Sequence, residues 1–273
     1  MNATAPVGLI LPPDDKAIVD SILAPAAPQQ KHGITVNEGY RCLCLGETGS
    51  GKTSLMRVIV YATIAQRYAN FALIHDAKGI FPEYRHSIKL TNVREFVQRK
   101  GMLPGEMPVY SFRGNVRADV SVSAEEVAAL SRYLGKKGKE LNGQWLPNPH
   151  LCVIEEVSEA ASAGRKHVKA PSVLWIAEQG RKVGVSLLGT TQSPRKIPLD
   201  LLGQASSVAF FRLTGADANY LGERLELNPS MVQTIRGPEG EGLPNYQFVL
   251  WNKGTPWDGQ IHTLNKRTAM MFE

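Results

Sequence analysis

The sequence lacks the patterns that mark disulfide-rich, zinc-binding and membrane-spanning proteins. Only three cysteines occur, and none has a CxxC or Cys/His spacing. Cys42, Cys44 and Cys152 lie in apolar runs, so we expect small core residues of a reduced, intracellular protein. No run approaches the roughly 20 apolar residues of a membrane span, and the N-terminus lacks the basic region of a signal peptide. These absences favour a cytoplasmic protein.

Positively charged residues are in modest excess over negatively charged ones. Lys and Arg number 31 and Asp and Glu 25, which gives a net charge of +6 among 273 residues. A basic balance fits a polyanionic partner such as nucleic acid, but it also fits an ordinary solvated surface. The 43% hydrophobic content and the length allow one large core or two modest domains.

Short apolar runs alternate with amphipathic segments from residue 41 onward. The runs expected to be strands cover 41–45, 71–76, 107–112, 151–156, 185–191, 207–214 and 245–251. The segments expected to be helical cover 52–68, 92–100, 123–134, 172–183 and 216–225, and residues 14–23 form a further short helix-like piece. Several runs are continuously apolar, as in strands covered on both faces. The pattern therefore predicts an α/β fold whose mostly parallel central sheet has helices on both faces, with an additional strand near the C-terminus.

One glycine-dense loop joins a predicted strand to a predicted helix. GETGSGKT, residues 46–53, matches G-x-x-x-x-G-K-[ST] in the strand–loop–helix context that this phosphate-binding motif requires. The residues expected to bind a nucleoside triphosphate are Gly46, Glu47, Thr48, Gly49, Ser50, Gly51, Lys52, Thr53 and Ser54. Lys52 would reach the β- and γ-phosphates, and the Thr53 hydroxyl would ligate Mg²⁺. ATP is favoured over GTP because no clear guanine-reading NKxD motif occurs.

Acidic and amide side chains follow two other predicted strands. In LCVIEE, residues 151–156, four apolar residues precede Glu155 and Glu156. We expect Glu155 to hold Mg²⁺ through its water shell and Glu156 to act as the base toward the attacking water. Gln192, in TTQSP, would lie near the γ-phosphate if its strand lies between the other two. Both acids could instead be exposed residues that end a strand.

A basic pair, Arg181 and Lys182, ends the predicted helix before that last strand. Cations at a helix C-terminus are favourable to the helix dipole, which is sufficient to explain the pair. Alternatively, Arg181 is a catalytic arginine finger that crosses to the γ-phosphate of a neighbouring copy. Spacing alone leaves both interpretations open.

Together these motifs resemble the FtsK–HerA superfamily of P-loop motor ATPases. The matching pieces are GETGSGKTS (46–54), IHDAKG (74–79), LCVIEE (151–156), EQGRKVGVSLLGTTQSP (178–194) and FRLTGADANYL (211–221). They fall within residues 41 to about 225, and the piece at 178–194 is the most specific. The P-loop alone would identify only the broad class.

The resemblance implies a RecA-like P-loop NTPase fold, assembled as a ring that is usually a hexamer, with ATP between subunits and double-stranded DNA in the pore. On the family pattern, Gln192 is the sensor residue and Arg181 matches the trans arginine finger of the coupling-protein branch. Asp76 and Lys78 match an acidic–lysine pair that is structural or pore-facing. The family usually has Asp then Glu where this chain has Glu155 then Glu156, so the longer first acid would reach Mg²⁺ through water.

Two basic clusters are candidates for DNA phosphate contacts, which are independent of base sequence. One cluster lies in RYLGKKGKELNGQW and contains Lys136 and Lys137; the other lies in AGRKHVK and contains Arg165, Lys166 and Lys169. Each could equally be a solvated basic loop.

The domain organisation expected from these features is an N-terminal arm or linker at 1–38, a P-loop ATPase motor domain at 39–253 and a C-terminal tail at 254–273. Such a compact member most resembles the genome-packaging ATPases of tailless icosahedral viruses, which often contain a membrane. It would work in the host cytoplasm or be incorporated in the virion, with a viral vertex or membrane protein as a further partner. The alternatives are a plasmid, conjugative or HerA-like DNA-transfer motor, a protein-moving phage assembly ATPase, and a slow nucleotide-gated binding module.

Overall fold

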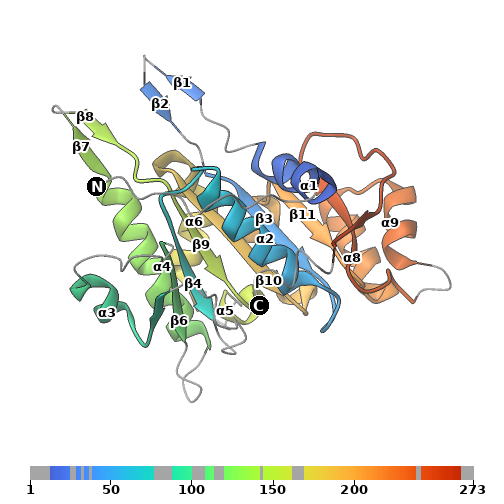
Figure 1. The fold of residues 1–273 in the computed structure, drawn as a ribbon. Coiled ribbons are helices and arrows are strands. Elements are labelled where there is room, and N and C mark those ends of the chain that lie inside the picture. Colours follow the sequence, from blue (N-terminus) through green and yellow to red (C-terminus); the bar gives the residue numbers. More distant parts are fainter. Residues whose placement is uncertain are drawn as a thin grey trace.

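The computed structural model of the chain describes residues 13–24, 29–31, 34–36, 39–76, 88–99, 108–113, 120–141, 144–161, 169–237 and 241–265. Within these ranges the core is a nine-stranded sheet in the order β13-β12-β11-β3-β10-β9-β4-β6-β5 (Figure 1). Its strands are β3 (Arg41–Leu45), β4 (Phe71–Asp76), β5 (Ile88–Leu90), β6 (Val109–Arg113), β9 (His150–Ile154), β10 (Val185–Thr191), β11 (Ser207–Phe210), β12 (Gln247–Asn252) and β13 (His262–Thr263).

Neighbouring strands from β11 to β5 run parallel, whereas β12 and β13 are antiparallel additions at one edge. β10 lies between β3 and β9, because Leu188 is in register with Cys42 on one side and Val153 on the other. The central strands are buried along their whole length, as continuous apolar runs require. The expected mostly parallel sheet with an added C-terminal strand is confirmed.

Helices cover both faces of the sheet (Figure 1). They are α1 (Pro13–Leu23), α2 (Lys52–Ala65), α3 (Val93–Gln98), α4 (Val120–Lys137), α5 (Val157–Ala160), α6 (Pro171–Gln179), α7 (Leu199–Gly203), α8 (Gly215–Leu225) and α9 (Pro229–Arg236), with 3₁₀ turns η2 (Gly180–Val183) and η3 (Pro194–Lys196). α1 and α2 share one core cluster with Cys42, Cys44 and Val153. α4 to α9 pack in another with Leu43, Cys152 and other residues of the opposite face.

The described chain also contains elements that the apolar pattern did not predict. These are the two antiparallel hairpins β1 (Gln29–Lys31) with β2 (Ile34–Val36) and β7 (Lys139–Leu141) with β8 (Gln144–Leu146), together with β5, α7, α9 and β13. The helix-like piece at 14–23 is α1, and it packs on α2 through Ile18, Val19 and Ile22. No helix in the described ranges combines the length and apolar character needed to cross a bilayer.

Candidate active site

The motif residues meet at the carboxyl ends of the central parallel strands. β3, β9 and β10 are parallel neighbours, so the segments that follow their carboxyl ends lie next to one another. These segments are the glycine-dense loop after β3, the acidic pair after β9 and Gln192 after β10. The strand order expected for Gln192 is therefore confirmed.

The loop after β3 depends on glycine for its shape. Gly49 has φ 74° and Gly51 has φ 112°, conformations that L side chains rarely adopt. A Cβ on Gly51 would also lie 3.1 Å from the Cα of Tyr246. The loop then leads into α2, whose first-turn N–H groups have no carbonyl partner within the helix. This curled backbone at a helix N-terminus fits the phosphates of a nucleotide.

Lys52 is folded across the loop that precedes it. Its side chain is buried, and its Nζ donates a hydrogen bond to the carbonyl oxygen of Glu47 at 2.6 Å. Thr53 and Ser54 follow in the first turn of α2. The loop itself is tied to the sheet, because the N–H of Gly46 donates to Thr191 O at 3.2 Å and that of Glu47 to Arg212 O at 2.8 Å.

A chain of hydrogen bonds connects the acidic pair to the loop. The side-chain amide nitrogen of Gln192 donates to Glu156 Oε1 at 2.8 Å, and its backbone N–H donates to Glu156 Oε2 at 3.3 Å. Thr48 Oγ1 donates to Gln192 Oε1 at 2.7 Å. Because the amide oxygen accepts from Thr48, the amide nitrogen is directed toward the carboxylate. The structure thus joins three predicted site residues, one from each motif segment.

Glu156 has a backbone conformation that is unusual for its type. Its φ and ψ are both 50°, in the left-handed region, and it precedes the short helix α5. Its side chain is buried, so the carboxylate lies in a partly desolvated site. Non-glycine residues in this region carry strain of about 1–2 kcal/mol, which is concentrated at functional positions in many proteins.

Glu155 points to the other face of the sheet. Successive side chains of a strand alternate between faces, and Val153 packs in the cluster that contains α2. The N–H of Glu155 continues the parallel ladder by donating to His75 O at 3.3 Å, so the alternation extends to Glu155. Glu155 therefore lies on the same face as the start of α2, where Thr53 is located. Two oxygen donors on one face suit Mg²⁺.

Arg181 lies at the opposite end of the sheet from this site. It belongs to η2, which precedes the amino end of β10, and its carbonyl accepts from Gly39 just before β3. Arg41 is the first residue of β3, and its own burial lowers its pKa. The nearby positive charge of Arg181 lowers that pKa further. The seven residues of β10 separate Arg181 from Gln192, which corresponds to about 20 Å. Arg181 therefore does not reach the site of its own chain.

The structure separates the two basic clusters. Lys136 and Lys137 are exposed at the C-terminus of α4, which leads toward the amino ends of the strands. The Lys136 ammonium lies 5.2 Å from the centre of the Trp175 ring, a cation–π distance. Lys169 is exposed shortly before α6, near the carboxyl ends. Arg165 and Lys166 lie outside the described residues.

Next to the acidic pair, β4 ends with two buried polar residues. His75 Nε2 is 2.8 Å from Ser123 Oγ, and burial lowers the His75 pKa to about 4 although Asp76 opposes this shift. Asp76 is buried in turn. Lys78, its expected companion, lies outside the described residues.

The glycine-dense loop also contacts residues that its motif did not indicate. Arg212 Nε pairs with Glu47 Oε2 at 3.0 Å, and Tyr246 donates its backbone N–H to Ser50 O at 2.7 Å. Arg212 follows β11 and Tyr246 precedes β12, so both are far from the loop in sequence. Arg212 lies in the matching piece at 211–221, although no role was assigned to it there, whereas no local pattern marks Tyr246.

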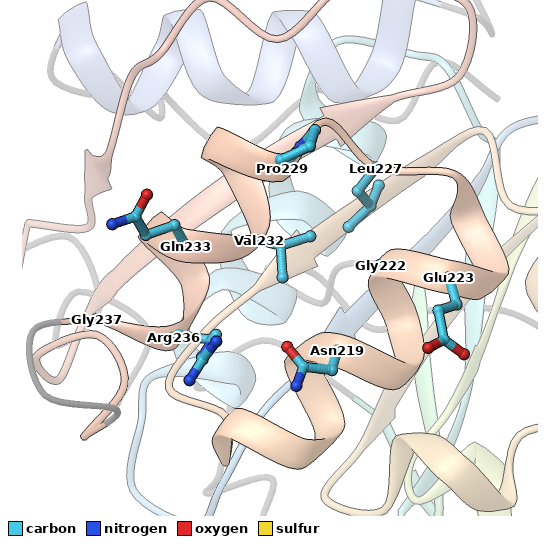
Figure 2. A pocket seen from close by; sticks show the side chains of 9 residues that line it. All are labelled: Asn219, Gly222, Glu223, Leu227, Pro229, Val232, Gln233, Arg236 and Gly237. Carbon is cyan, nitrogen blue, oxygen red and sulfur yellow. The ribbon is translucent and has the colours of Figure 1, made fainter.

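A hollow of about 710 Å³ lies elsewhere, between α8 and α9 (Figure 2). Asn219, Glu223, Gln233 and Arg236 are among the residues that line it. The two helices pack closely, because a Cβ on Gly222 would lie 2.7 Å from Val232 Cγ2. None of the predicted site residues lines this hollow.

Comparison with known proteins finds similarity in structure alone. No protein-family model and no curated protein matches the sequence. The genome packaging NTPase B204 of Sulfolobus turreted icosahedral virus 2, in complex with sulfate, has 14% identity and a TM-score of 0.61 over 84% of this chain and 98% of its own. VirB4 of Thermoanaerobacter pseudethanolicus has 8% identity and a TM-score of 0.60 over 89% and 97%.

The bacterial conjugative coupling protein TrwBΔN70 has 11% identity and a TM-score of 0.57, over 92% of each chain. A further structure of B204 contains AMPPCP. At identities of 8 to 14%, these likenesses show the fold. The chain therefore has the RecA-like P-loop ATPase fold that its motifs predicted.

Proposed function

We propose that the chain is a Mg²⁺-dependent ATPase that moves double-stranded DNA as a ring of identical copies. The observation that carries the proposal is the hydrogen-bonded connection from Thr48 through Gln192 to Glu156. It places a carboxylate and an orienting amide beside the phosphate-binding loop, which is the arrangement that hydrolysis of a terminal phosphate requires.

Each residue has a role that follows from its position. The loop and Lys52 bind the phosphates, while Thr53 and Glu155 would hold Mg²⁺, which neutralises charge on the phosphates when it is bound. Glu156 accepts the proton of the water that attacks the γ-phosphorus, and the bond from that phosphorus to the ADP oxygen breaks. Gln192 donates one hydrogen bond to each carboxylate oxygen of Glu156. Because each oxygen has a second lone pair, these bonds can orient the carboxylate while it accepts that proton.

Within this class, packaging of a viral genome is the use that we favour. The support is the similarity of fold to B204, which is named a genome packaging NTPase and is covered over 98% of its length. The basic balance of the chain suits DNA, and the separation of Arg181 from its own site suits a ring in which each site is shared by two copies. A viral vertex or membrane protein would anchor such a ring in the host cytoplasm or virion.

The test is ATP hydrolysis by the purified protein with and without linear double-stranded DNA, at low and moderate salt. DNA should stimulate hydrolysis, and the stimulation should fade with salt because phosphate contacts release counterions. Glu156→Gln is the control, in which both rates should fall by about 100-fold or more. Hydrolysis that DNA does not change would contradict a DNA motor and favour a protein-moving ATPase. Hydrolysis that persists in the variant would contradict the assignment of Glu156.

A further inference from the structure

The proposed nucleotide site has two flanks, one on each side of β3. β10 and β9, with Gln192 and Glu156 at their ends, lie on one flank. β11 and β12 lie on the other. Because water attacks the terminal phosphate, the γ-phosphate belongs beside Glu156. The other end of the nucleotide then extends away from Glu156, toward the flank of β11 and β12.

Tyr246 lies on that second flank, against the end of the loop. Its Cα and Cδ1 lie 3.1 and 3.2 Å from the position of a Cβ on Gly51, so both backbone and ring contact the loop's last glycine. The backbone N–H of Tyr246 donates to Ser50 O at 2.7 Å, and its carbonyl accepts from the N–H of Leu264 at 2.9 Å. The side chain is partly buried, with part of it facing solvent.

The conformation of Tyr246 is strained. Its φ is 65°, which for a bulky residue is an outlier that glycine would adopt at little cost. The two backbone hydrogen bonds hold it there, and neither of them needs the side chain. Backbone strain of this kind clusters at active sites and ligand-binding positions, where the surrounding structure maintains it.

We propose that Tyr246 stacks on the base of the bound nucleotide. An aromatic ring beside the loop, on the flank away from the hydrolytic residues, offers a π-face to the base, and purines present the larger surface for stacking. Tyr246 is thus a specificity residue that favours ATP and ADP over pyrimidine nucleotides. This inference rests on the nucleotide binding proposed above.

The test compares ligands with and without a base. Calorimetry measures the Kd of ATP, ADP and inorganic tripolyphosphate, each with Mg²⁺, for the wild-type chain, Tyr246→Leu and Tyr246→Phe. Tyr246→Leu should weaken ATP and ADP by roughly 5- to 150-fold and leave tripolyphosphate unchanged, because only the base loses a partner. Tyr246→Phe should bind all three as the wild type does. Tyr220→Leu, which removes an aromatic ring from α8, is the matched control and should change none of them.

A second measurement needs no variant of uncertain folding. The triphosphate of 2-aminopurine riboside should lose fluorescence on binding to the wild-type chain, because stacking quenches this base. Unquenched emission in a bound complex would overturn the inference, and so would equal weakening of ATP and tripolyphosphate in Tyr246→Leu, which would make Tyr246 a support of the loop. Wild-type protein that binds neither ATP nor tripolyphosphate would overturn the proposed function itself, and is a distinct result.

Discussion

Replacing Arg181 by alanine is expected to remove most ATP hydrolysis, although Arg181 lies at the far end of the sheet from Glu156 and Gln192. The separation of about 20 Å along β10 excludes a contact within one chain. If Arg181 contacts the γ-phosphate of a neighbouring copy, its loss should lower kcat by about 10³- to 10⁵-fold, as for other arginine fingers. Nucleotide affinity should change far less.

Mixing two inactive variants gives this prediction its quantitative form. An Arg181→Ala copy keeps Glu156, and a Glu156→Gln copy keeps Arg181. When the two are mixed equally, about one quarter of the interfaces should pair an intact Glu156 with an intact Arg181, since each interface joins two copies drawn at random. If interfaces act independently, hydrolysis should recover to about a quarter of the wild-type rate.

The assay is steady-state ATP hydrolysis of each variant and of the mixture, with light scattering to confirm assembly. Lys182→Ala is the matched control, because Lys182 is the neighbouring cation of η2 and its Nζ already donates to Gln179 Oε1 at 3.1 Å. It should retain near wild-type activity. An assembled mixture with no recovered hydrolysis would refute the assignment of Arg181 in trans.

Two further predictions concern stability. Burial lowers the His75 pKa to about 4, below the value of 6.5 expected in the unfolded chain. As the pH drops, the unfolded state therefore binds the proton first. The free energy of unfolding should fall by up to ~3 kcal/mol between about pH 6.5 and pH 4. His75→Gln should flatten the dependence of the thermal midpoint on pH between about 4 and 6.5, and an unchanged slope would contradict this origin. Glu226 is exposed with φ 52° at the C-terminus of α8, so Glu226→Gly should stabilise by about 0.5–1 kcal/mol in chemical denaturation. The matched Glu223→Gly, within α8, should destabilise by about 1 kcal/mol, and equal effects of the two changes would contradict the argument.

The central part of the fold is predictable because its signals are local. β3, the glycine loop and α2 follow from one apolar run, one spacing pattern and one amphipathic segment. The continuous burial of β10 is likewise evident from its composition, since its residues are apolar, small or hydroxyl-bearing and none is charged. Once the strand order is known, the position of Gln192 beside Glu156 can also be predicted.

Other features depend on tertiary contacts that no local pattern contains. The short strand β5 carries an exposed lysine between two buried apolar residues, too brief a pattern to identify from the sequence. Tyr246 is joined to Ser50 across almost 200 positions of sequence, through a backbone N–H to carbonyl hydrogen bond that any residue except proline could donate. The positive φ of Tyr246 could not be predicted from the sequence either, because tyrosine rarely adopts such a conformation.

The two ends of the sheet divide the proposed motor into separate tasks. The carboxyl ends carry the loop, Glu156 and Gln192, whereas the amino ends carry Arg181 and the C-terminus of α4 with Lys136. This division follows from chain order in a parallel sheet, where the connection between two parallel strands returns the chain from one end of the sheet to the other. The predicted DNA contacts therefore belong to two different surfaces. Contacts near Lys169 would lie close to the hydrolytic residues, where a change at the γ-phosphate can move them directly, whereas contacts at Lys136 would have to respond across the whole length of β10.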